Sequence, residues 1–354
     1  MKIKLLNAGN GDSFLLSFND KGIKRNILID GGTAETYYSQ SSNSEGELKT
    51  EIESLKKKGE CIDLLILTHI DNDHICGLLK WFELDPNAHE LIRNVWFNSG
   101  KIIANYLKEQ ENEDLMIGLK VFPNSRTGVN EAIEFEDYLS EKKIWNKKIY
   151  LQGQKIKEFG IEIHILSPNE GQLKKLLKEY KKTIGDQVFT SAKEKDWDKN
   201  ICEFIEEEEK EDFKFNQDYS PKNGSSISFI LIANNEKYLF LADSPPNDIV
   251  KQIAELGYSN EQPLDVKFMK VSHHGSKLNT SKSLLQIVKT NEYLISTDSL
   301  RHNHPNKRTL ARILNENPNA TFHFNYEHVR NAIFSDKDRK DYPFKAKVTK
   351  ELEY

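Results

Sequence analysis

The sequence has few cysteines, no long hydrophobic run and no excess of positive charge. Three cysteines among 354 residues are too few for a disulfide framework, and this usage suits a reducing compartment. No apolar run approaches the roughly 20 residues that a membrane-spanning helix needs. Residues 1–7 lack the apolar core and cleavage site of a signal peptide. We therefore expect a cytoplasmic protein with no membrane segment.

The overall charge also limits the partners that the chain can take. The formal net charge is −5, which argues against tight, nonspecific binding of polyanions because such binding needs a basic surface. A polyanion held locally by metal ions and a few lysines stays open. Charged residues make up 30% of the chain and hydrophobic residues 37%, and the length suffices to bury a large core.

Strands and helices alternate along most of the chain, with hairpins near the start. This order predicts an α+β protein with a mixed sheet and helices outside it. We expect strands at 3–6, 13–18, 27–29, 64–67, 91–97, 161–166, 225–233, 237–242, 266–271, 293–296 and 320–324. We expect helices at 45–58, from near Gly77, and at 247–257, 281–290 and 307–316.

Residues 169–222 are highly charged, and helices are expected at 171–182 and 198–212. The acidic run 206–209 is typical of a solvated helix face. Because this stretch has too few apolar residues for a core of its own, we interpret it as a helical insertion in a single domain, 1–354. We expect it to serve either in binding a protein partner or as a lid, and the sequence does not separate the two.

Segment 69–74 is the most informative part of the chain. It places two histidines and two aspartates directly after the apolar run 64–67. Such groups at the end of a buried strand repel one another and resist desolvation unless a positive charge lies among them. A divalent metal supplies that charge, since neutral imidazole and ionised carboxylate are its usual ligands. The alternative is a hydrated loop.

Other predicted strand ends carry residues of the same kinds. Layered folds build their sites at such positions. The groups are Asp30, Asp243, His273 with His274, and His302 with His304.

The order of these motifs resembles the metallo-β-lactamase superfold. More narrowly, it resembles the soluble hydrolase domain of ComEC-type DNA-uptake proteins. The matching segments span residues 1 to about 330, with little likeness at 101–160 and 169–222. They are Gly11-Asp12-Ser13, Asp30-Gly31-Gly32, Thr68 to Gly77, Asn223-Gly224-Ser225-Ser226, Ala242-Asp243, His273-His274-Gly275-Ser276 and His304-Pro305.

The resemblance implies a four-layer αββα sandwich with a site for one or two divalent metal ions. It implies that His69 and Asp71 bind a first metal, while Asp73 and His74 bind a second. Asp243 would bridge both ions. Either His273 or His274 would complete the second site. We favour His274, because neighbours on a strand point to opposite faces and only one can face the metal.

Further roles follow from the same resemblance. Asp73 counts as catalytic as well as ligating. His304 would donate a hydrogen bond to developing charge or protonate the leaving oxygen. Residues expected to support the ligands or hold substrate are Asp30, Thr68, Ser276, Lys277 and His302.

Two departures from the wider superfamily bear on the metal. Its usual His-x-His is His69-x-Asp71 here, and Asn223 stands where a mid-chain histidine is usual. Oxygen-rich ligation makes Mn²⁺ a rival to Zn²⁺. The expected activity is hydrolysis by a metal-bound hydroxide, with a phosphodiester or nucleotide as substrate, so that the chain is a phosphodiesterase or a nuclease. The alternatives are a lactonase, amidase or peptidase, and a non-catalytic binding module.

Overall fold

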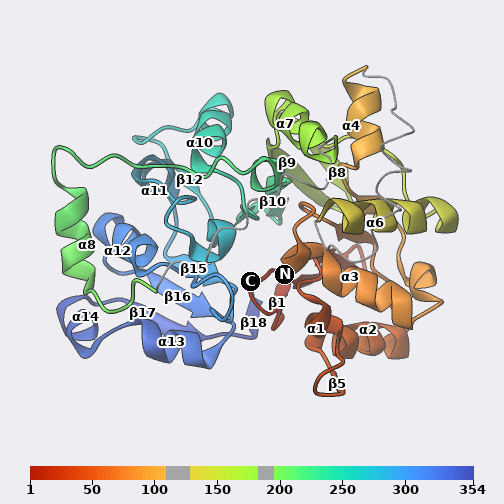
Figure 1. Cartoon of the computed structure of the whole chain (residues 1–354), viewed down its shortest axis with the longest axis horizontal. Coiled ribbons are helices and arrows are strands. Elements are labelled where there is room, and N and C mark those ends of the chain that lie inside the picture. Colours follow the sequence, from red (N-terminus) through yellow and green to blue (C-terminus); the bar gives the residue numbers. More distant parts are fainter. Residues whose placement is uncertain (109–127, 182–194) are drawn as a thin grey trace. The chain divides into compact units, whose positions relative to one another are not determined.

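The computed structural model describes residues 1–108, 128–181 and 195–354 (Figure 1). These residues fall into two compact units, each with one large sheet. Unit 1 takes the described residues of Met1–Leu151, Pro168–Ser191 and Glu351–Tyr354, and unit 2 takes those of Gln152–Ser167 and Ala192–Lys350. The predicted single domain with its insertion remains a prediction. Within the described ranges, no helix has the length and apolar character that crossing a membrane requires.

Unit 1 contains a six-stranded mixed sheet in the order β18-β1-β2-β3-β6-β7. The first four strands of that order are antiparallel, whereas β3, β6 and β7 run parallel. The strands are β1 (Lys2–Leu5), β2 (Phe14–Asp20), β3 (Ile23–Ile29), β6 (Leu64–Ile66), β7 (Val95–Trp96) and β18 (Glu351–Glu353), with a small hairpin of β4 (Tyr38–Ser39) and β5 (Ser44–Glu45) beside them. Because β18 pairs with β1, both chain ends meet at one sheet edge, where the backbone amide of Tyr354 donates to the Met1 carbonyl at 2.8 Å.

The helices of unit 1 pack on one face of this sheet. Leu15, Leu28, Leu65 and Val95 share a buried cluster with apolar side chains of α2, α3, α6 and α7. The helices are α1 (Ala34–Tyr37), α2 (Glu47–Lys58), α3 (Asn72–Leu84), η1 (Ala88–Leu91), α4 (Gly100–Tyr106), α6 (Val129–Lys142) and α7 (Glu170–Tyr180). In α2, apolar residues at three- and four-residue spacing make the buried stripe, and Gly59 ends the helix in the left-handed conformation.

Unit 2 contains an eight-stranded sheet in the order β17-β16-β15-β13-β11-β10-β9-β8. Strands β8 to β11 are antiparallel neighbours, and β11, β13, β15, β16 and β17 run parallel. The strands are β8 (Lys155–Glu158), β9 (Ile161–Ser167), β10 (Ser228–Ala233), β11 (Glu236–Phe240), β13 (Met269–Lys270), β15 (Glu292–Ile295), β16 (Thr321–Phe324) and β17 (Lys345–Val348), with a separate pair of β12 (Leu264–Asp265) and β14 (Val288–Lys289).

Helices of unit 2 bury their apolar sides in a second cluster. Ile249 and Ile253 of one helix and Leu310 of another pack with the strand residues Leu239 and Ile295. The helices are α8 (Ile201–Glu208), α9 (Pro221–Gly224), α10 (Pro246–Glu255), η2 (Ser272–Gly275), α11 (Lys282–Ile287), α12 (Lys307–Glu316), α13 (Glu327–Ile333) and α14 (Asp336–Asp341).

Three differences from the sequence-based expectations matter. Helix α3 begins at Asn72 rather than near Gly77, so Asp73 and His74 lie in its first turn. The expected strand at 91–97 is reduced to β7, and α13, α14, β17 and β18 had not been expected. The acidic run is not simply solvated, because Glu207 and Glu208 form ion pairs with Arg308 and Arg312 of α12.

Candidate metal-binding residues in each unit

The candidate residues of unit 1 gather where two parallel strands end. Asp30 follows β3 and Thr68 follows β6, and these strands pair with Ile29 opposite Ile66. The carboxyl ends of parallel strands meet at one edge of a sheet. Asp30 has a φ of 56°, and this left-handed conformation turns the chain after β3.

Asp30 is fully buried and accepts three hydrogen bonds. Its Oδ1 accepts from the Thr68 amide at 2.7 Å, and its Oδ2 accepts from the Thr68 hydroxyl at 2.7 Å. The same Oδ2 lies 2.8 Å from Nδ1 of His74. Three donors satisfy a buried carboxylate that has no access to water. The support role predicted for Asp30 and Thr68 therefore has a physical basis in these contacts.

These contacts fix the tautomers of two histidines. Because a carboxylate only accepts, Nδ1 of His74 carries the proton that it shares with Asp30. Thr68 spends its single hydroxyl proton on Asp30, so its oxygen accepts from Nδ1 of His69 at 3.1 Å. The lone pair of each ring therefore lies on Nε2, the nitrogen that a metal would use.

The two aspartates of the 69–74 segment lie at the start of α3. Asp71 holds the N-cap position without capping the helix through its side chain, and its Oδ2 is 3.8 Å from Nε2 of His69. Asp73 lies in the first turn of α3, and its Oδ2 accepts a hydrogen bond from the side-chain Nδ2 of Asn10 at 2.5 Å. The helix start thus places the Asp71 carboxylate beside the His69 ring, whereas the Asp73 carboxylate bonds to Asn10.

Asp12 is a further candidate that was not predicted as a ligand. It is 1% exposed, and one of its carboxylate oxygens lies within 4.8 Å of a ring nitrogen of His74. Its turn is held against α3, because the Asp12 amide donates to the Asp73 carbonyl and a Cβ on Gly11 would lie 1.7 Å from that carbonyl oxygen. An aspartate placed just before an apolar strand was the available signal.

The candidate residues of unit 2 also follow neighbouring parallel strands. Asp243 comes after β11, and His273 and His274 come after β13, which pairs with β11. Nε2 of His274 lies 3.5 Å from Asp243 Oδ2, and Nε2 of His273 lies 3.7 Å from the same oxygen. The buried Lys270 ammonium lies 3.9 Å from Asp243 Oδ1 and donates to the Ala242 carbonyl.

Which histidine of the pair would bind a metal stays a prediction, but the reason for favouring only one of them does not hold. It assumed a strand, in which neighbouring side chains alternate. The φ angles are instead 47° at His273 and 53° at His274, so the chain is in a left-handed turn that brings both rings toward one carboxylate. The rings differ in burial, since the His274 side chain is 1% exposed and that of His273 is 24% exposed.

Each histidine of unit 2 is oriented by a different group. Nδ1 of His274 donates to the Ser296 carbonyl at 3.0 Å. Nδ1 of His273 lies 3.1 Å from Asn279 Oδ1 and 3.3 Å from Asp218 Oδ2. Both of these oxygens accept hydrogen bonds. A donor, the Asn223 side-chain Nδ2, also lies 3.3 Å from Nδ1, but it donates to Asp218 Oδ2 at the shorter distance of 2.6 Å, so Nδ1 of His273 carries the proton. In both rings the lone pair is on Nε2, as in unit 1.

Asp218 was missed because it lies in the charged stretch interpreted as an insertion. Burial alone would raise the pKa of this carboxyl, but hydrogen bonds and attraction from His273, together with the Asn223 amide, lower it to about 2. The Asn223 amide donates to Asp218 Oδ2 at 2.6 Å. Asn223 therefore contributes to the site through Asp218. No local pattern in the sequence marks this aspartate.

The remaining predicted residues lie around His273. The His304 ring is 5.0 Å from that of His273 and 6.4 Å from that of His302, which is exposed. The pKa of His304 lies well below its usual value. Burial is the largest cause, and repulsion from the neighbouring histidines adds to it. Ser276 is buried and its hydroxyl accepts from the Leu278 amide, while the backbone of Lys277 is bonded to Asn306.

Comparison with known proteins gives one strong match and several weak likenesses. A family model described as "Metallo-beta-lactamase superfamily" matches residues 6–298. No curated protein matches the chain. Among solved structures, the metallo-beta-lactamase fold protein YhfI from Bacillus subtilis shares 10% identity at a TM-score of 0.42, covering 100% of this chain and 98% of that chain.

Two enzymes give similar values. An isothiocyanate hydrolase from Delia radicum gut bacteria shares 12% identity at a TM-score of 0.40, with 100% of this chain and 99% of that chain covered. A diphosphatase from the PhnP family shares 12% identity at a TM-score of 0.39, with 100% of this chain and 98% of that chain covered. These likenesses are too weak to bear on the substrate. The family model, however, covers most of the chain, so the predicted α+β metallo-β-lactamase fold is confirmed and the chain belongs to the metallo-beta-lactamase superfamily.

Proposed function

We propose that the chain is a metal-dependent hydrolase that cleaves phosphodiesters. The superfamily is typically hydrolytic and binds divalent metals, and this supports the general class. The observation that carries the proposal is that four histidines have the same tautomer. They are His69, His74, His273 and His274. In each unit, hydrogen bonds within that unit occupy Nδ1 and leave the lone pair on Nε2. Metal-binding histidines are typically arranged in this way.

The ligand set that we propose is the one predicted from the sequence, with one addition. Imidazole nitrogens and carboxylate oxygens suit Zn²⁺ and Mn²⁺. Asp12 is added because its carboxylate lies beside the His74 ring. The proposed ligands are His69, Asp71, Asp73, His74, Asp243 and His274, with Asp12 and His273 as further candidates.

Bound dications would supply Lewis acidity and lower the pKa of a water molecule toward neutrality. The chain's own residues orient and support the ligands. Asp30 and Thr68 hold the rings of His69 and His74, and Asp218 holds His273. The depressed pKa of His304 keeps its imidazole neutral, and in that form it donates a hydrogen bond to the reacting phosphoryl group. Ser276 and Lys277 follow His274-Gly275 in sequence and are proposed to hold a phosphate oxygen.

The phosphodiester class rests on the resemblance to the ComEC-type hydrolase domain. That resemblance lies in the ordered motifs from Gly11-Asp12-Ser13 to His304-Pro305. The net charge of −5 favours a nucleotide-sized substrate over a long polyanion. The same motifs supply the proposed metal ligands, so metal binding and substrate cleavage can be tested on one preparation.

The test begins with elemental analysis of protein purified without added metal. We expect one or two ions per chain, and cleavage of bis(p-nitrophenyl) phosphate, DNA or RNA with Mn²⁺ or Zn²⁺. His74→Ala should lower the metal content and activity, whereas His328→Ala, at an exposed position on α13, should change neither. Cleavage of lactone, amide or peptide substrates without any phosphodiester would contradict the proposed substrate class, and absence of bound metal would contradict the whole proposal.

A further inference from the structure

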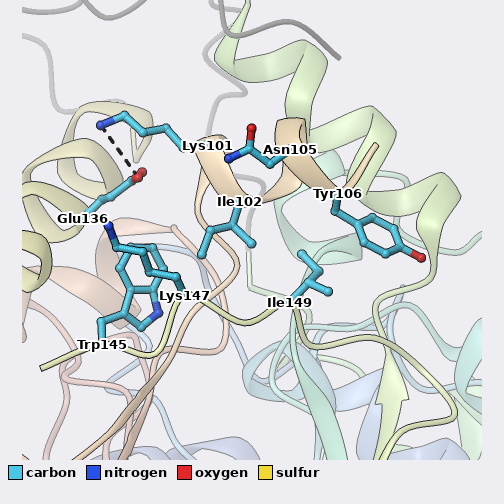
Figure 2. A pocket seen from close by; sticks show the side chains of 8 residues that line it. All are labelled: Lys101, Ile102, Asn105, Tyr106, Glu136, Trp145, Lys147 and Ile149. Carbon is cyan, nitrogen blue, oxygen red and sulfur yellow. Dashed lines mark ion pairs between the residues drawn. The ribbon is translucent and has the colours of Figure 1, made fainter. Parts of the chain in front are cut away.

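Unit 1 contains a cavity of about 440 Å³ that none of the proposed metal ligands lines. Figure 2 shows it between α4, α6 and the segment that follows α6. Its volume lies in the range of small-molecule sites, roughly 300–1,000 Å³. The lining residues are Lys101, Ile102, Asn105, Tyr106, Glu136, Trp145, Lys147 and Ile149.

One end of the cavity holds a buried carboxyl between two lysines. Glu136 is 5% exposed, and the ammonium of Lys101 lies 3.8 Å from its Oε1. Burial raises the pKa of Glu136, against the attraction of Lys101 and Lys147, which both lower it. The lining thus carries two lysines and one carboxyl; a second carboxylate, that of Asp137, lies outside the lining, 3.9 Å from the Lys101 ammonium. Such a lining attracts a ligand that has an anionic group.

The rest of the lining combines the apolar side chains of Ile102 and Ile149 with the rings of Trp145 and Tyr106 and the amide of Asn105. One neighbour of the Trp145 ring is Phe97, at 5.8 Å between ring centroids. The indole Nε1 of Trp145 is buried, and it has no hydrogen-bond partner among the described residues. Ile102 and Ile149 add apolar surface, as the side chains in Figure 2 show. A buried donor without a partner costs free energy, which a ligand acceptor would recover.

We propose that this cavity binds a nucleobase together with its adjoining phosphate. A base offers a flat ring for Trp145, Ile102 and Ile149, since base–aromatic stacking accepts any base. Base edges carry acceptors for the indole N–H and donors for the Glu136 carboxylate. Lys101 and Lys147 supply the charge that a phosphate needs.

Other ligand classes fit the lining less well. A fatty acyl chain would leave the Glu136 carboxyl and the indole N–H without partners in an apolar contact. A simple inorganic anion would leave the isoleucines and the indole ring uncovered. The proposal goes beyond the hydrolase assignment because no candidate metal ligand lines the cavity. Binding and hydrolysis can therefore be tested separately.

Isothermal titration calorimetry of the full chain in excess EDTA tests the proposal. The probes are the four nucleoside monophosphates, ribose 5-phosphate and a short single-stranded oligodeoxynucleotide. We expect a mononucleotide or the oligonucleotide to bind at least tenfold more tightly than ribose 5-phosphate. Binding of mononucleotides assigns the site to free nucleotides, and binding of the oligonucleotide alone assigns it to a single strand. Binding of ribose 5-phosphate as tightly as a nucleotide would overturn the role of the base.

A pair of adjacent lysines provides a matched control. Lys147 lines the cavity and Lys148 does not, although both are exposed. Lys147→Glu should weaken nucleotide binding at least tenfold, and Lys148→Glu should change it less than twofold. Trp145→Phe keeps an aromatic ring but removes the indole donor, and it should weaken binding about threefold or more. Absence of nucleotide binding by the unaltered chain, or equal effects of the two lysine variants, would overturn the proposal.

Discussion

The two units hold their histidines in different ways. In unit 1 a single carboxylate, Asp30, bonds directly to His74 and reaches His69 through the Thr68 hydroxyl. In unit 2 the two histidines have separate anchors, the Ser296 carbonyl for His274 and the pair Asp218 and Asn279 for His273. The orientation of the rings is therefore coupled in unit 1 and divided in unit 2.

The anchors also come from different distances along the chain. Every orienting contact of unit 1 lies between Asp30 and His74, on two paired strands and one helix start. In unit 2 the contacts extend from Asp218 to Ser296. The segment before Asp218 is fixed to α12 and α14, because Asp196 accepts from the amide of Lys307 and the Ile201 amide donates to Asp338. The orienting contacts of the histidines in unit 2 thus span a longer stretch of the chain than those in unit 1.

Breaking the ion pair between α12 and α14, which hold the segment before Asp218, should cause the largest loss of stability. Lys307 and Asp338 form a 2.6 Å ion pair in which each side chain is 1% exposed. Asp338→Ala leaves the buried Lys307 ammonium with the Trp197 carbonyl but without its charged partner, which costs about 3–5 kcal/mol of unfolding free energy. Urea denaturation of the full chain measures this loss. Asp336→Ala, at an exposed position in the same helix, should cost little, and equal losses would show that the ion pair is not the cause.

The same ion pair predicts a loss of stability in acid. Burial would raise the pKa of Asp338, but the hydrogen bonds from Lys307 and from backbone amides outweigh it and lower that pKa. A lowered folded-state pKa stabilises the fold above the usual aspartate value of about 3.9, and this contribution disappears as pH falls below it. The unfolding free energy of the wild type should therefore drop below that pH. Asp338→Asn should flatten the drop, and an unchanged profile would contradict the assignment.

Removing the shared carboxylate tests the coupling in unit 1. Asp30→Asn keeps the shape but places an amide N–H₂ against donors, so both rings lose their orientation. We expect metal affinity to fall by about 100-fold, the upper end for residues that orient ligands. Chelator competition measures the affinity. Asp20→Asn, at the far end of the β2–β3 hairpin, serves as the control.

Removing the separate anchor in unit 2 should have a smaller effect. Asp218→Asn weakens the hold on His273 only, since Ser296 still holds His274. We expect about a tenfold loss of metal affinity, with Asp212→Asn at an exposed position as the control. A loss as large as that of Asp30→Asn would remove the distinction between coupled and divided orientation.

The same contrast explains what the sequence could and could not predict. The family motifs and the strand ends of unit 1 are local, so Asp30, Thr68 and the 69–74 segment could be selected from the sequence. The start of α3 was placed too late, because the polar residues of its first turn hide the helical periodicity. Asp12 was seen only as part of a turn, since burial of a carboxylate cannot be read from its neighbours.

The limits of prediction from the sequence are clearer in unit 2. The paired histidines were expected to alternate as in a strand, and positive φ angles at both positions reverse that expectation. Asp218 is one acidic residue among many in a charged stretch, and its contact with His273 joins positions far apart in the chain. Likewise, the pairing of Glu207 and Glu208 with α12 depends on tertiary contacts that no local pattern encodes.

The smallest effect should come from the hydroxyl that links Asp30 to His69. Thr68→Val removes the acceptor for Nδ1 of His69 and one donor to Asp30, while the direct bond from Asp30 to His74 remains. Thr68→Ser retains the hydroxyl. We therefore expect metal affinity to fall by about three- to tenfold in the valine variant and by less than twofold in the serine variant. Because these variants differ chiefly in the hydroxyl, equal losses in both would show that packing of the threonine methyl, rather than the hydrogen-bond relay, orients His69.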